Sequence, residues 1–519
     1  MKSSSVFSFR LGSLSAVCLV VMSVLMSSCG KDSCQMTKDL DALYDNLPFA
    51  MPAYQLPQIP DYQVDIADFG GINDGTADNT QAFADAVAHI AQKGGGELRV
   101  GPGIWLTGPI EFTSNFCLNV EKGAVILFTR DHSKYPLIRS TFEGWDAWRC
   151  QSPLSAYNCE NIAIVGEGVL DGQGDSWRPV KKGKMTGSQW QKLLDSGGAL
   201  NRKGDIWFPS EGGRAGYENG ALRSSSDRET LESVKDFFRP VMLSFRHCKN
   251  VLLTGVSFQN SPAWCLHPYC CENVVLYRVS VRNPWYSQNG DGLDLESCTN
   301  SIITQCTFDV GDDAICIKSG KDAQGRRRGM PTQDALIVGN TVYHGHGGFV
   351  IGSEMSGGAR RLYVKDCTFL GTDVGLRFKS TRGRGGVVED IFIDGIRMVD
   401  IPTEALSFNL YYSGKSPVPE EGDEPDQVKV EMRPVDETTP VFRKIYISNV
   451  ICDGADCAFL FNGLPEMKIS EVEIHNSVFT ARRGGILAQV DGILLDKVSI
   501  NPSEGKELLY QDAHNVTVK

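Results

Sequence analysis

The chain has 519 residues, of which 41% are hydrophobic and 22% are charged, with 54 glycines and 23 prolines. This ordinary globular composition excludes a wholly disordered or collagen-like chain. The 63 acidic residues outnumber the 51 lysines and arginines and give a net charge of -12. We therefore expect no nucleic acid partner, because proteins that bind nucleic acids through their overall charge are usually basic. An acidic polymer would have to bind through a local cationic patch.

The first residues have the pattern of an export signal. Lys2 and Arg10 precede an apolar run from Val17 to Leu25, which is too short to form a helix that spans a membrane. Cys29 follows two serines and resembles the modified cysteine of bacterial lipoproteins. We interpret residues 1–28 as a signal peptide and Cys29 as a lipidation site, with a plain secretory signal as the alternative.

This interpretation predicts an exported protein. Its only membrane contact would be the lipid anchor, which would hold it at the bacterial outer membrane on the periplasmic or the cell-surface face. Without lipidation the protein would be secreted. We expect residues 29–64 to form a lipidated linker and residues 65–519 to form one domain.

That domain begins with a helical pattern. Asp78 can cap a helix in which Phe83, Val87 and Ile90 fall on one face, and glycines 94–96 end it. We expect this short amphipathic helix to cap the N-terminal end of the fold that follows, where apolar surface and strand edges would otherwise be exposed.

From Asn250 onward one short pattern recurs. NVLLTGVSF (250–258), NVVLYRVSV (273–281) and NSIITQCTF (300–308) alternate apolar and polar residues and are rich in β-branched types, as strands are. Further units begin about 20 to 35 residues apart, with one longer gap and no helical pattern between them. The repeat predicts an all-β fold, a right-handed parallel β-helix. A sandwich or barrel is less favoured because its strands need hairpin turns.

Two segments interrupt the repeat. Residues 178–238 have a polar, mixed pattern, and residues 413–440 contain a cluster of acidic residues. We expect both to be insertions that project as loops beside the coil.

A second strand in each unit carries the polar residues of interest. In GLDLES (292–297), AICIKS (314–319) and GLRFKS (375–380), alternate apolar side chains should point into the core and the residues between them outward. Stacking these segments, with PAWCLHP (262–268) aligned on GLDLES, gives one outward column: His267, Glu296, Lys318, Gly352, Lys379 and Asn409.

Three aspartates and a histidine should meet just before these outward strands. The register places Asp291 beside Asp313, and Asp312 beside His346 on the following coil. Neighbouring strands lie about 4.8 Å apart, so the four groups should converge. Repulsion between like charges raises the pKa of at least one carboxyl, which can then donate a proton while an ionised neighbour activates water. Glycoside hydrolysis requires such a pair.

Two cations complete the predicted patch. Arg377 and Lys379 lie on the same face, one coil beyond His346, and can pair with the carboxylates of acidic sugars. Each residue alone has an ordinary explanation in a turn or on a solvated face, but the aligned set favours function. Because three carboxylates can also hold a calcium ion, a calcium site is the main physical alternative.

Four short motifs resemble, in their order and spacing, the active-site motifs of the polygalacturonases, family 28 of the glycoside hydrolases: NGDG (289–292), GDD (311–313), GHG (345–347) and RFK (377–379). The resemblance runs from about residue 65 to the end of the chain, so it also implies the β-helix of pectate-lyase-like enzymes. The chain differs from the family pattern at Gly290, where threonine is usual, and at Phe378, where isoleucine is frequent.

The resemblance implies inverting hydrolysis of α-galacturonosidic bonds. By motif, Asp312 resembles the general acid, and Asp291 and Asp313 resemble the pair that activates water. His346 is implied to tune the acid or orient a sugar. The two cations of the patch are implied to hold the galacturonate carboxylate at the cleaved bond.

Exo-action is favoured by two further features. SPAWCLHP (261–268) resembles exo-acting members, and both insertions are long enough to close one end of a groove. We expect His267 and Lys318, in the outward column, to contribute to substrate binding. The expected substrate is a pectic polysaccharide or oligogalacturonide, bound by a monomer without a cofactor or metal. Two alternatives stay open: a calcium-dependent polysaccharide lyase on the same fold, and a non-catalytic glycan-binding surface β-helix.

Overall fold

The computed structural model describes residues 30–412 and 431–519. The predicted signal peptide and the predicted lipidation site Cys29 lie outside the described residues, as does most of the predicted insertion at 413–440. None of the described helices has the length and apolar character needed to cross a membrane.

The chain divides into two units at Ala42 and Leu43. The first unit contains helix α1 (Gly30–Ala42), which lies within the stretch predicted to be a linker. The second unit begins with an extended segment that packs on the coil, since Asn300 Nδ2 donates a hydrogen bond of 3.1 Å to the carbonyl of Ala53. The stretch predicted to be a linker thus contains a helix and a segment that contacts the coil.

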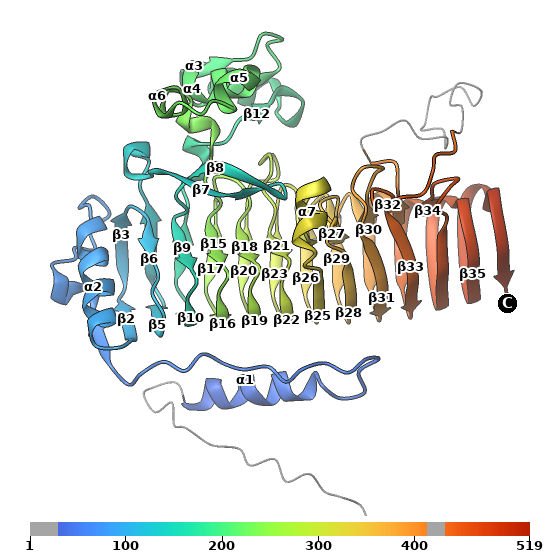
Figure 1. Cartoon of the computed structure of the whole chain (residues 1–519), viewed down its shortest axis with the longest axis horizontal. Coiled ribbons are helices and arrows are strands. Elements are labelled where there is room, and N and C mark those ends of the chain that lie inside the picture. The colour runs from blue at the N-terminus through green and yellow to red at the C-terminus, as the bar shows by residue number, and fades with distance from the viewer. Residues whose placement is uncertain (1–29, 413–430) are drawn as a thin grey trace, which may run out of the picture. The chain divides into compact units, whose positions relative to one another are not determined.

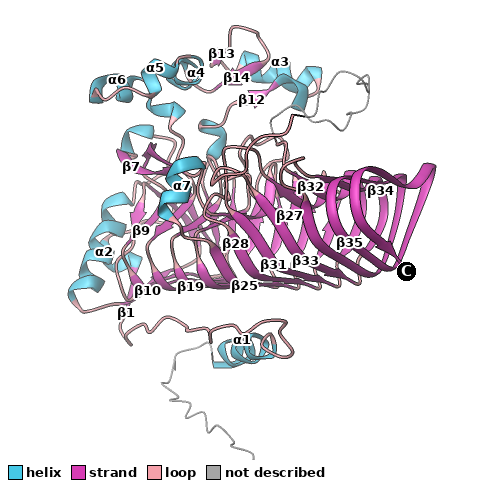
Figure 2. Ribbon diagram, turned by 45° about the vertical axis from the view of Figure 1, so that its right-hand side comes forward, coloured by secondary structure: helices cyan, strands magenta, loops and turns pink. Residues whose placement is uncertain are grey.

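The second unit is a right-handed parallel β-helix, as predicted (Figure 1). Its main sheet has 30 strands, and each strand pairs in parallel with strands one coil before and after it. Figure 2 shows the strands stacked along the coil with the helices outside them. The strands form three faces, which we name the first, second and third face.

The first face consists of β1 (Gln63–Asp65), β2 (Gly96–Val100), β5 (Phe116–Val120), β10 (Glu160–Gly166), β16 (Lys249–Thr254), β19 (Glu272–Tyr277), β22 (Thr299–Thr304), β25 (Thr332–Val338), β28 (Ala359–Lys365), β31 (Val387–Asp394) and β33 (Val441–Ser448). The second face consists of β3 (Gly103–Thr107), β6 (Ala124–Phe128), β11 (Val169–Asp171), β17 (Ser257–Gln259), β20 (Ser280–Arg282), β23 (Thr307–Asp309), β26 (Thr341–His344) and β29 (Thr368–Leu370).

The third face consists of β4 (Ile110–Glu111), β9 (Leu154–Tyr157), β15 (Leu243–Arg246), β18 (Leu266–Tyr269), β21 (Leu293–Glu296), β24 (Asp313–Lys318), β27 (Gly347–Ile351) and β30 (Val374–Lys379). The last coils are formed by long strands that bend from face to face: β32 (Arg397–Asn409), β34 (Ile451–Asn462) and β35 (Ile469–Val518).

An asparagine ladder aligns the coils at the start of the first-face strands. Asn161 donates from Nδ2 to Asn115 Oδ1 at 3.0 Å, Asn250 to Asn161 at 3.0 Å, and Asn273 to Asn250 at 2.9 Å. Asn300 continues the ladder by donating to Asn273. All five residues have φ between 55° and 60°, a left-handed conformation that asparagine tolerates better than most residues. The ladder therefore satisfies the side-chain amides of these asparagines and also fixes the register between successive coils.

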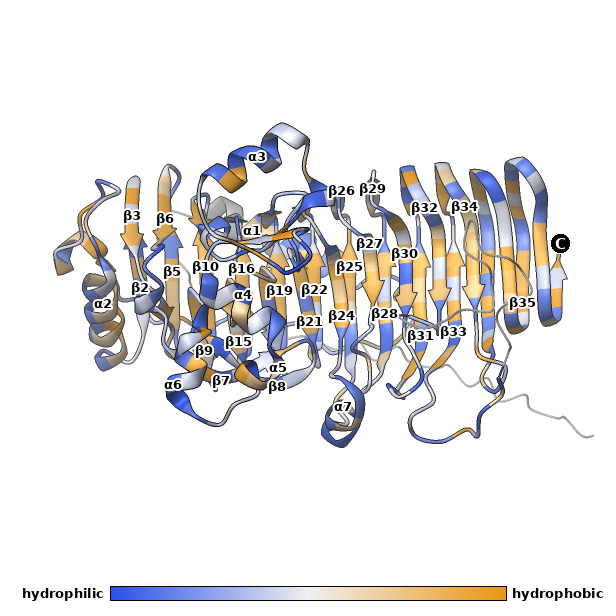
Figure 3. Ribbon diagram, turned by 90° about the horizontal axis from the view of Figure 1, so that it is seen from above, coloured by the Kyte–Doolittle hydropathy of each residue, from blue (hydrophilic) through white to orange (hydrophobic). Residues whose placement is uncertain are grey.

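The core lies inside the coil. On the third face the inward column runs through Leu293, Ile315, Phe349 and Leu376, which pair in register and are fully buried. Figure 3 shows apolar residues continuing from strand to strand along the coil. Because side chains alternate along a strand, the residues between them point away from this core, as predicted.

The register prediction is wrong at one coil. Leu266 pairs with Leu293 and Tyr269 with Glu296, so in the strand register His267 is aligned with Asp294 and not with Glu296, although its side chain still contacts Glu296. The shift is two residues, which keeps the alternation of inward and outward side chains intact.

The predicted N-terminal cap is helix α2 (Thr80–Gln92). Its N-cap is Asn79, one residue later than predicted, while Asp78 accepts a hydrogen bond of 2.9 Å from the Thr80 amide. The helix buries five apolar side chains against the first coils: Ala82, Phe83, Ala86, Val87 and Ile90.

The first insertion is folded and is not a plain loop. It contains helices α3 (Gly187–Asp195), α4 (Glu211–Glu218), α5 (Gly220–Arg223) and α6 (Arg228–Ser233), and an antiparallel sheet of β12 (Val180–Lys181), β14 (Ile206–Phe208) and β13 (Ala199–Leu200). An antiparallel hairpin, β7 (Leu137–Phe142) and β8 (Trp145–Cys150), precedes it, and helix α7 (Asp322–Arg328) follows β24.

We predict that Asn273→Ala lowers the free energy of unfolding by about 2 kcal/mol or more. The substitution removes two ladder hydrogen bonds, each worth about 1 kcal/mol, and places alanine in a left-handed conformation that costs about 1–2 kcal/mol. Thermal unfolding followed by circular dichroism checks this. The matched variant Asn273→Gly loses the same hydrogen bonds without the conformational cost, so it should unfold at a higher temperature than Asn273→Ala. Equal transitions for both variants and the parent would contradict the role of the ladder.

Candidate active site

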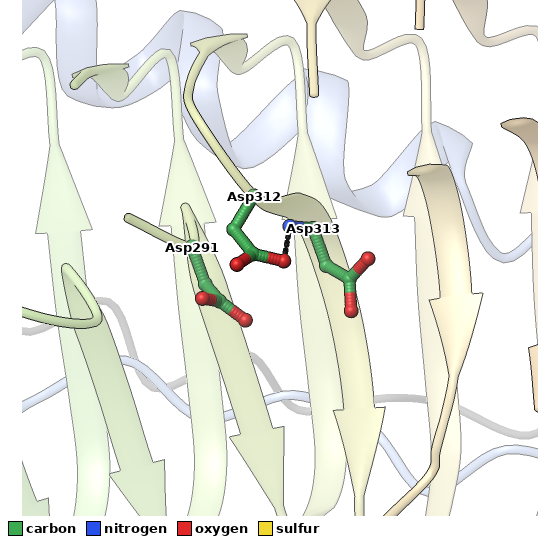
Figure 4. Close-up of side chains that lie close together, drawn as sticks. All are labelled: Asp291, Asp312 and Asp313. Carbon is green, nitrogen blue, oxygen red and sulfur yellow. Dashed lines mark hydrogen bonds between the residues drawn. The ribbon is translucent and has the colours of Figure 1, made fainter. Parts of the chain in front are cut away.

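Three aspartates converge where the third-face strands begin (Figure 4). Asp291 precedes β21, Asp313 is the first residue of β24, and Asp312 comes directly before it. One carboxylate oxygen from each lies within 4.8 Å of the others. Asp291 and Asp313 are buried, whereas the Asp312 side chain keeps 23% of its surface exposed. Asp312 is thus the member of the cluster that an incoming sugar would meet first.

Glycines let the turns before β21 and β24 pack closely. A Cβ placed on Gly290 would lie 1.8 Å from Ser287 Oγ, and one on Gly311 would lie 2.5 Å from the carbonyl oxygen of Pro284. The loop at 284–290 therefore presses directly on the turn that carries Asp312. This packing explains why glycine stands at position 290, where the family resemblance leads us to expect threonine.

Two cations hold Asp313 in its ionised form. Lys379 Nζ lies 2.6 Å from Asp313 Oδ2, and Arg377 Nη1 lies 3.4 Å from Oδ1. Burial alone would raise the pKa of Asp313, but the charges of Lys379 and Arg377 outweigh burial and lower it. Asp313 is therefore a carboxylate and not an acid in the free protein.

His346 stabilises the ionised form of Asp312. His346 Nδ1 lies 3.1 Å from Asp312 Oδ1, and its Nε2 lies 3.6 Å from Asp373 Oδ2. Burial opposes ionisation of Asp312, but the hydrogen bond and charge of His346 outweigh it and lower the pKa of Asp312 to about 2. The same hydrogen bond raises the pKa of His346.

Asp291 holds the proton of the cluster. Burial raises its pKa well above the ordinary value, and the nearby carboxylates of Asp294 and Asp312 raise it further. The opposite directions of these pKa shifts favour a proton on Asp291 and an ionised form of Asp312 and Asp313. The proton lies on Asp291, however, whereas the family resemblance assigns the general acid to Asp312. A proton must therefore reach Asp312 before it can act as the acid.

Lys318 and His267 are buried beside the aspartates. Lys318 Nζ lies 3.4 Å from Asp294 Oδ1, 3.1 Å from Glu354 Oε2 and 4.4 Å from the ring centroid of Trp264. His267 Nε2 lies 2.9 Å from Glu296 Oε2, and neither residue is exposed. Neither Lys318 nor His267 is presented to solvent, so their contact with substrate stays a prediction.

The sequence reasoning missed several neighbours of the patch. The Tyr412 ring centroid lies 5.1 Å from Lys379 Nζ and 5.9 Å from Arg377 Cζ, so this ring covers both cations. Glu354 pairs with Lys318, and Asp373 faces His346. Tyr412, Glu354 and Asp373 lie outside the four motifs, so the motifs gave no signal for them.

A parallel β-helix with clustered carboxyls beside two cations on its outer face has the groups that glycoside hydrolysis requires. A family model described as glycosyl hydrolases family 28 matches residues 219–457, and a probable polygalacturonase from Vitis vinifera is 30% identical over 392 residues, 74% of this chain and 68% of that protein. The chain belongs to family 28 of the glycosyl hydrolases.

Two other similar proteins bear on the mode of action. An exo-poly-alpha-D-galacturonosidase of Dickeya chrysanthemi is 25% identical over 366 residues, 67% of this chain and 57% of that protein. The crystal structure of a hyperthermoactive exopolygalacturonase from Thermotoga maritima has 29% sequence identity and a TM-score of 0.71, covering 91% of this chain and 97% of that chain. The chain spans 57 to 68% of the length of the Dickeya and Vitis proteins.

We predict that Asp312→Asn lowers the pKa of His346, because it removes the carboxylate whose hydrogen bond raises that pKa. The imidazole can be titrated by NMR in both proteins. Asp373→Asn serves as the matched control and should have a smaller effect, since Asp373 lies farther from the imidazole, at 3.6 Å against 3.1 Å. An unchanged titration of His346 in Asp312→Asn would show that the two groups do not interact as described.

Proposed function

We propose that this protein is a polygalacturonase that hydrolyses α-galacturonosidic bonds in pectic polysaccharide and acts from a chain end. The observation that carries the proposal is the cluster of three aspartates within 4.8 Å, next to Arg377 and Lys379. The carboxyls supply the acid and the base, and the cations select a sugar that is itself a carboxylate.

In this mechanism Asp312 protonates the glycosidic oxygen as the leaving sugar departs. Oxygens of Asp291 and Asp312 lie within 4.8 Å, a separation that one bridging water spans, so a proton on Asp291 can pass to Asp312 through that water. A bound uronate also competes with Asp313 for the charges of Lys379 and Arg377, which leaves Asp313 a stronger base toward water. Binding of the acidic sugar thus prepares the cluster for reaction.

His346 keeps Asp312 oriented during these steps. Its Nδ1 contacts Asp312 and its Nε2 faces Asp373, so the imidazole is held between two carboxylates. The interaction favours the ionised form of Asp312, which is the form that remains after proton donation. We propose that His346 tunes the acid and does not itself contact the scissile bond.

Exo-action is supported by the similar exo-acting proteins and by the folded insertion at 178–238, which rises from the coil (Figure 1). We propose that the insertion closes one end of the substrate-binding groove and leaves space for a terminal sugar only. Monogalacturonate or another single short product should therefore appear first when polygalacturonate is digested. A ladder of long oligomers at low conversion would overturn the exo assignment.

Asp312→Asn tests the catalytic assignment. We expect a loss of about 10²–10⁴-fold in kcat, the usual contribution of a general acid. Reducing ends released from polygalacturonate measure it, with Asp373→Asn as a control that keeps all three aspartates. Full activity in Asp312→Asn would overturn the assignment of Asp312 as the general acid, whereas a parent protein that releases no reducing ends would favour the non-catalytic glycan-binding alternative. An ultraviolet-absorbing unsaturated product that disappears with a chelator would favour the lyase.

The configuration of the product is a separate prediction. The family resemblance implies inversion, so the first product should be the β-anomer, which NMR of a fresh digest detects. Inverting enzymes usually hold their carboxyls about 6.5–9.5 Å apart, a wider spacing than here. If the α-anomer appears first, the close carboxyls act by retention and one of them is a nucleophile.

We also propose that the protein is exported and anchored by a lipid on Cys29. The proposal rests on the basic and apolar pattern of residues 1–28 and on the two serines before the cysteine. Cells supplied with labelled fatty acid should label the parent protein but not Cys29→Ser. Equal labelling of the two would contradict it.

A further inference from the structure

An exposed tryptophan lies on the loop that presses against the catalytic turn. Trp285 keeps 52% of its surface exposed, although tryptophan is usually well covered. It follows Pro284, whose carbonyl oxygen would lie 2.5 Å from a Cβ on Gly311, the residue before Asp312. The indole is therefore carried by a segment that packs against the turn before Asp312.

The loop is held by contacts that follow this tryptophan in the chain. Arg239 is 8% exposed and donates 3.0 Å hydrogen bonds to the Gln288 carbonyl and to Asn289 Oδ1. Tyr286 packs on the apolar centre of the insertion, which includes Trp190 and Trp207. The exposure of Trp285 is thus imposed by fixed neighbours.

A lysine of the insertion reaches the same ring. Lys184, in a short 3₁₀ helix (Lys182–Lys184), places Nζ 5.9 Å from the Trp285 ring centroid. The pair offers a flat apolar surface with an ammonium group at its side. The C–H face of a pyranose stacks on such a ring, and a uronate carboxylate pairs with the ammonium.

The position of the pair along the coil complements the cations already described. The 284–290 loop leads into β21, one coil before Asp312, whereas Arg377 lies two coils after Asp312, on β30. Cationic groups thus stand on both sides of the acid along the coil axis. An oligogalacturonide has a carboxylate on the sugars at both sides of its scissile bond.

We propose that Trp285 and Lys184 form a second uronate subsite, on the side of Asp312 opposite to Arg377 and Lys379. The subsite would bind the galacturonate at the walled end of the groove. The proposal rests on the proposed polygalacturonase activity, and it adds that the insertion supplies binding chemistry as well as a wall.

Kinetics with an unesterified and an end-esterified oligogalacturonide test the proposal. Lys184→Met should lower kcat/KM at least about 10-fold on the unesterified trimer, but little on a trimer methyl-esterified at the sugar bound there. Lys184→Arg should restore most of the loss. Trp285→Ala should lower kcat/KM on both substrates, because the stacking surface serves either sugar.

Lys182→Met is the matched control, because Lys182 is an exposed lysine of the same short helix. It should retain the parent kcat/KM on both substrates. Thermal unfolding of each variant should match the parent, since the changed side chains are at least partly exposed.

The outcomes separate this proposal from the proposed function. If the parent does not cleave oligogalacturonide, the polygalacturonase assignment fails. If the parent cleaves it but Lys184→Met and Trp285→Ala keep full kcat/KM, only the second subsite is wrong. Equal losses for Lys182→Met and Lys184→Met would also overturn the subsite, because the effect would then be one of general surface charge.

Discussion

Parallel pairing between successive coils is the constraint on which this structure depends. A strand spacing of about 4.8 Å turns residues one coil apart into side-chain neighbours. The asparagine ladder keeps that alignment by bonding each coil to the previous one through side chains in a left-handed turn. The active site is a direct result, since Asp291 and Asp313 meet only because their strands are in register.

The same stacking creates an electrostatic problem that the site solves with internal cations. Buried carboxylates on adjacent coils repel one another and lose hydration. Lys379 and Arg377 compensate Asp313, and His346 compensates Asp312, while Asp291 remains protonated. Because each carboxyl has a different partner, three chemically identical groups acquire different protonation states, and acid-base chemistry needs that difference.

Much of this could be predicted from the sequence, because a coiled repeat makes distant contacts regular. The alternation of residues in the third-face strands was enough to place Asp312 beside His346 and Arg377 two coils beyond Asp312. The prediction was wrong at His267, where the turn before β18 changes length and the register moves by two residues. The alternation of apolar and polar residues alone does not reveal a register shift of two residues, because such a shift leaves the same side chains on each face.

Other features depend on contacts that no periodic pattern encodes. The fold of the 178–238 insertion, the ring of Tyr412 over the two cations and the contact of Ser287 with Gly290 all join segments that do not repeat. The distribution of protons among the aspartates likewise depends on burial and on the surrounding charges, and the sequence shows neither. The motifs therefore identify the reacting groups but not which of them carries the proton.

Arg239 has a consequence for how the molecule loses activity. The Arg239 guanidinium, on the residue directly after the insertion, donates to the Gln288 carbonyl and to Asn289 in the loop that leads to Asp291. Local opening of the small helical insertion would therefore release the Arg239 side chain from the loop before Asp291, while the long coil stays intact. We therefore expect opening of the insertion to abolish activity at a lower temperature than that at which the solenoid unfolds.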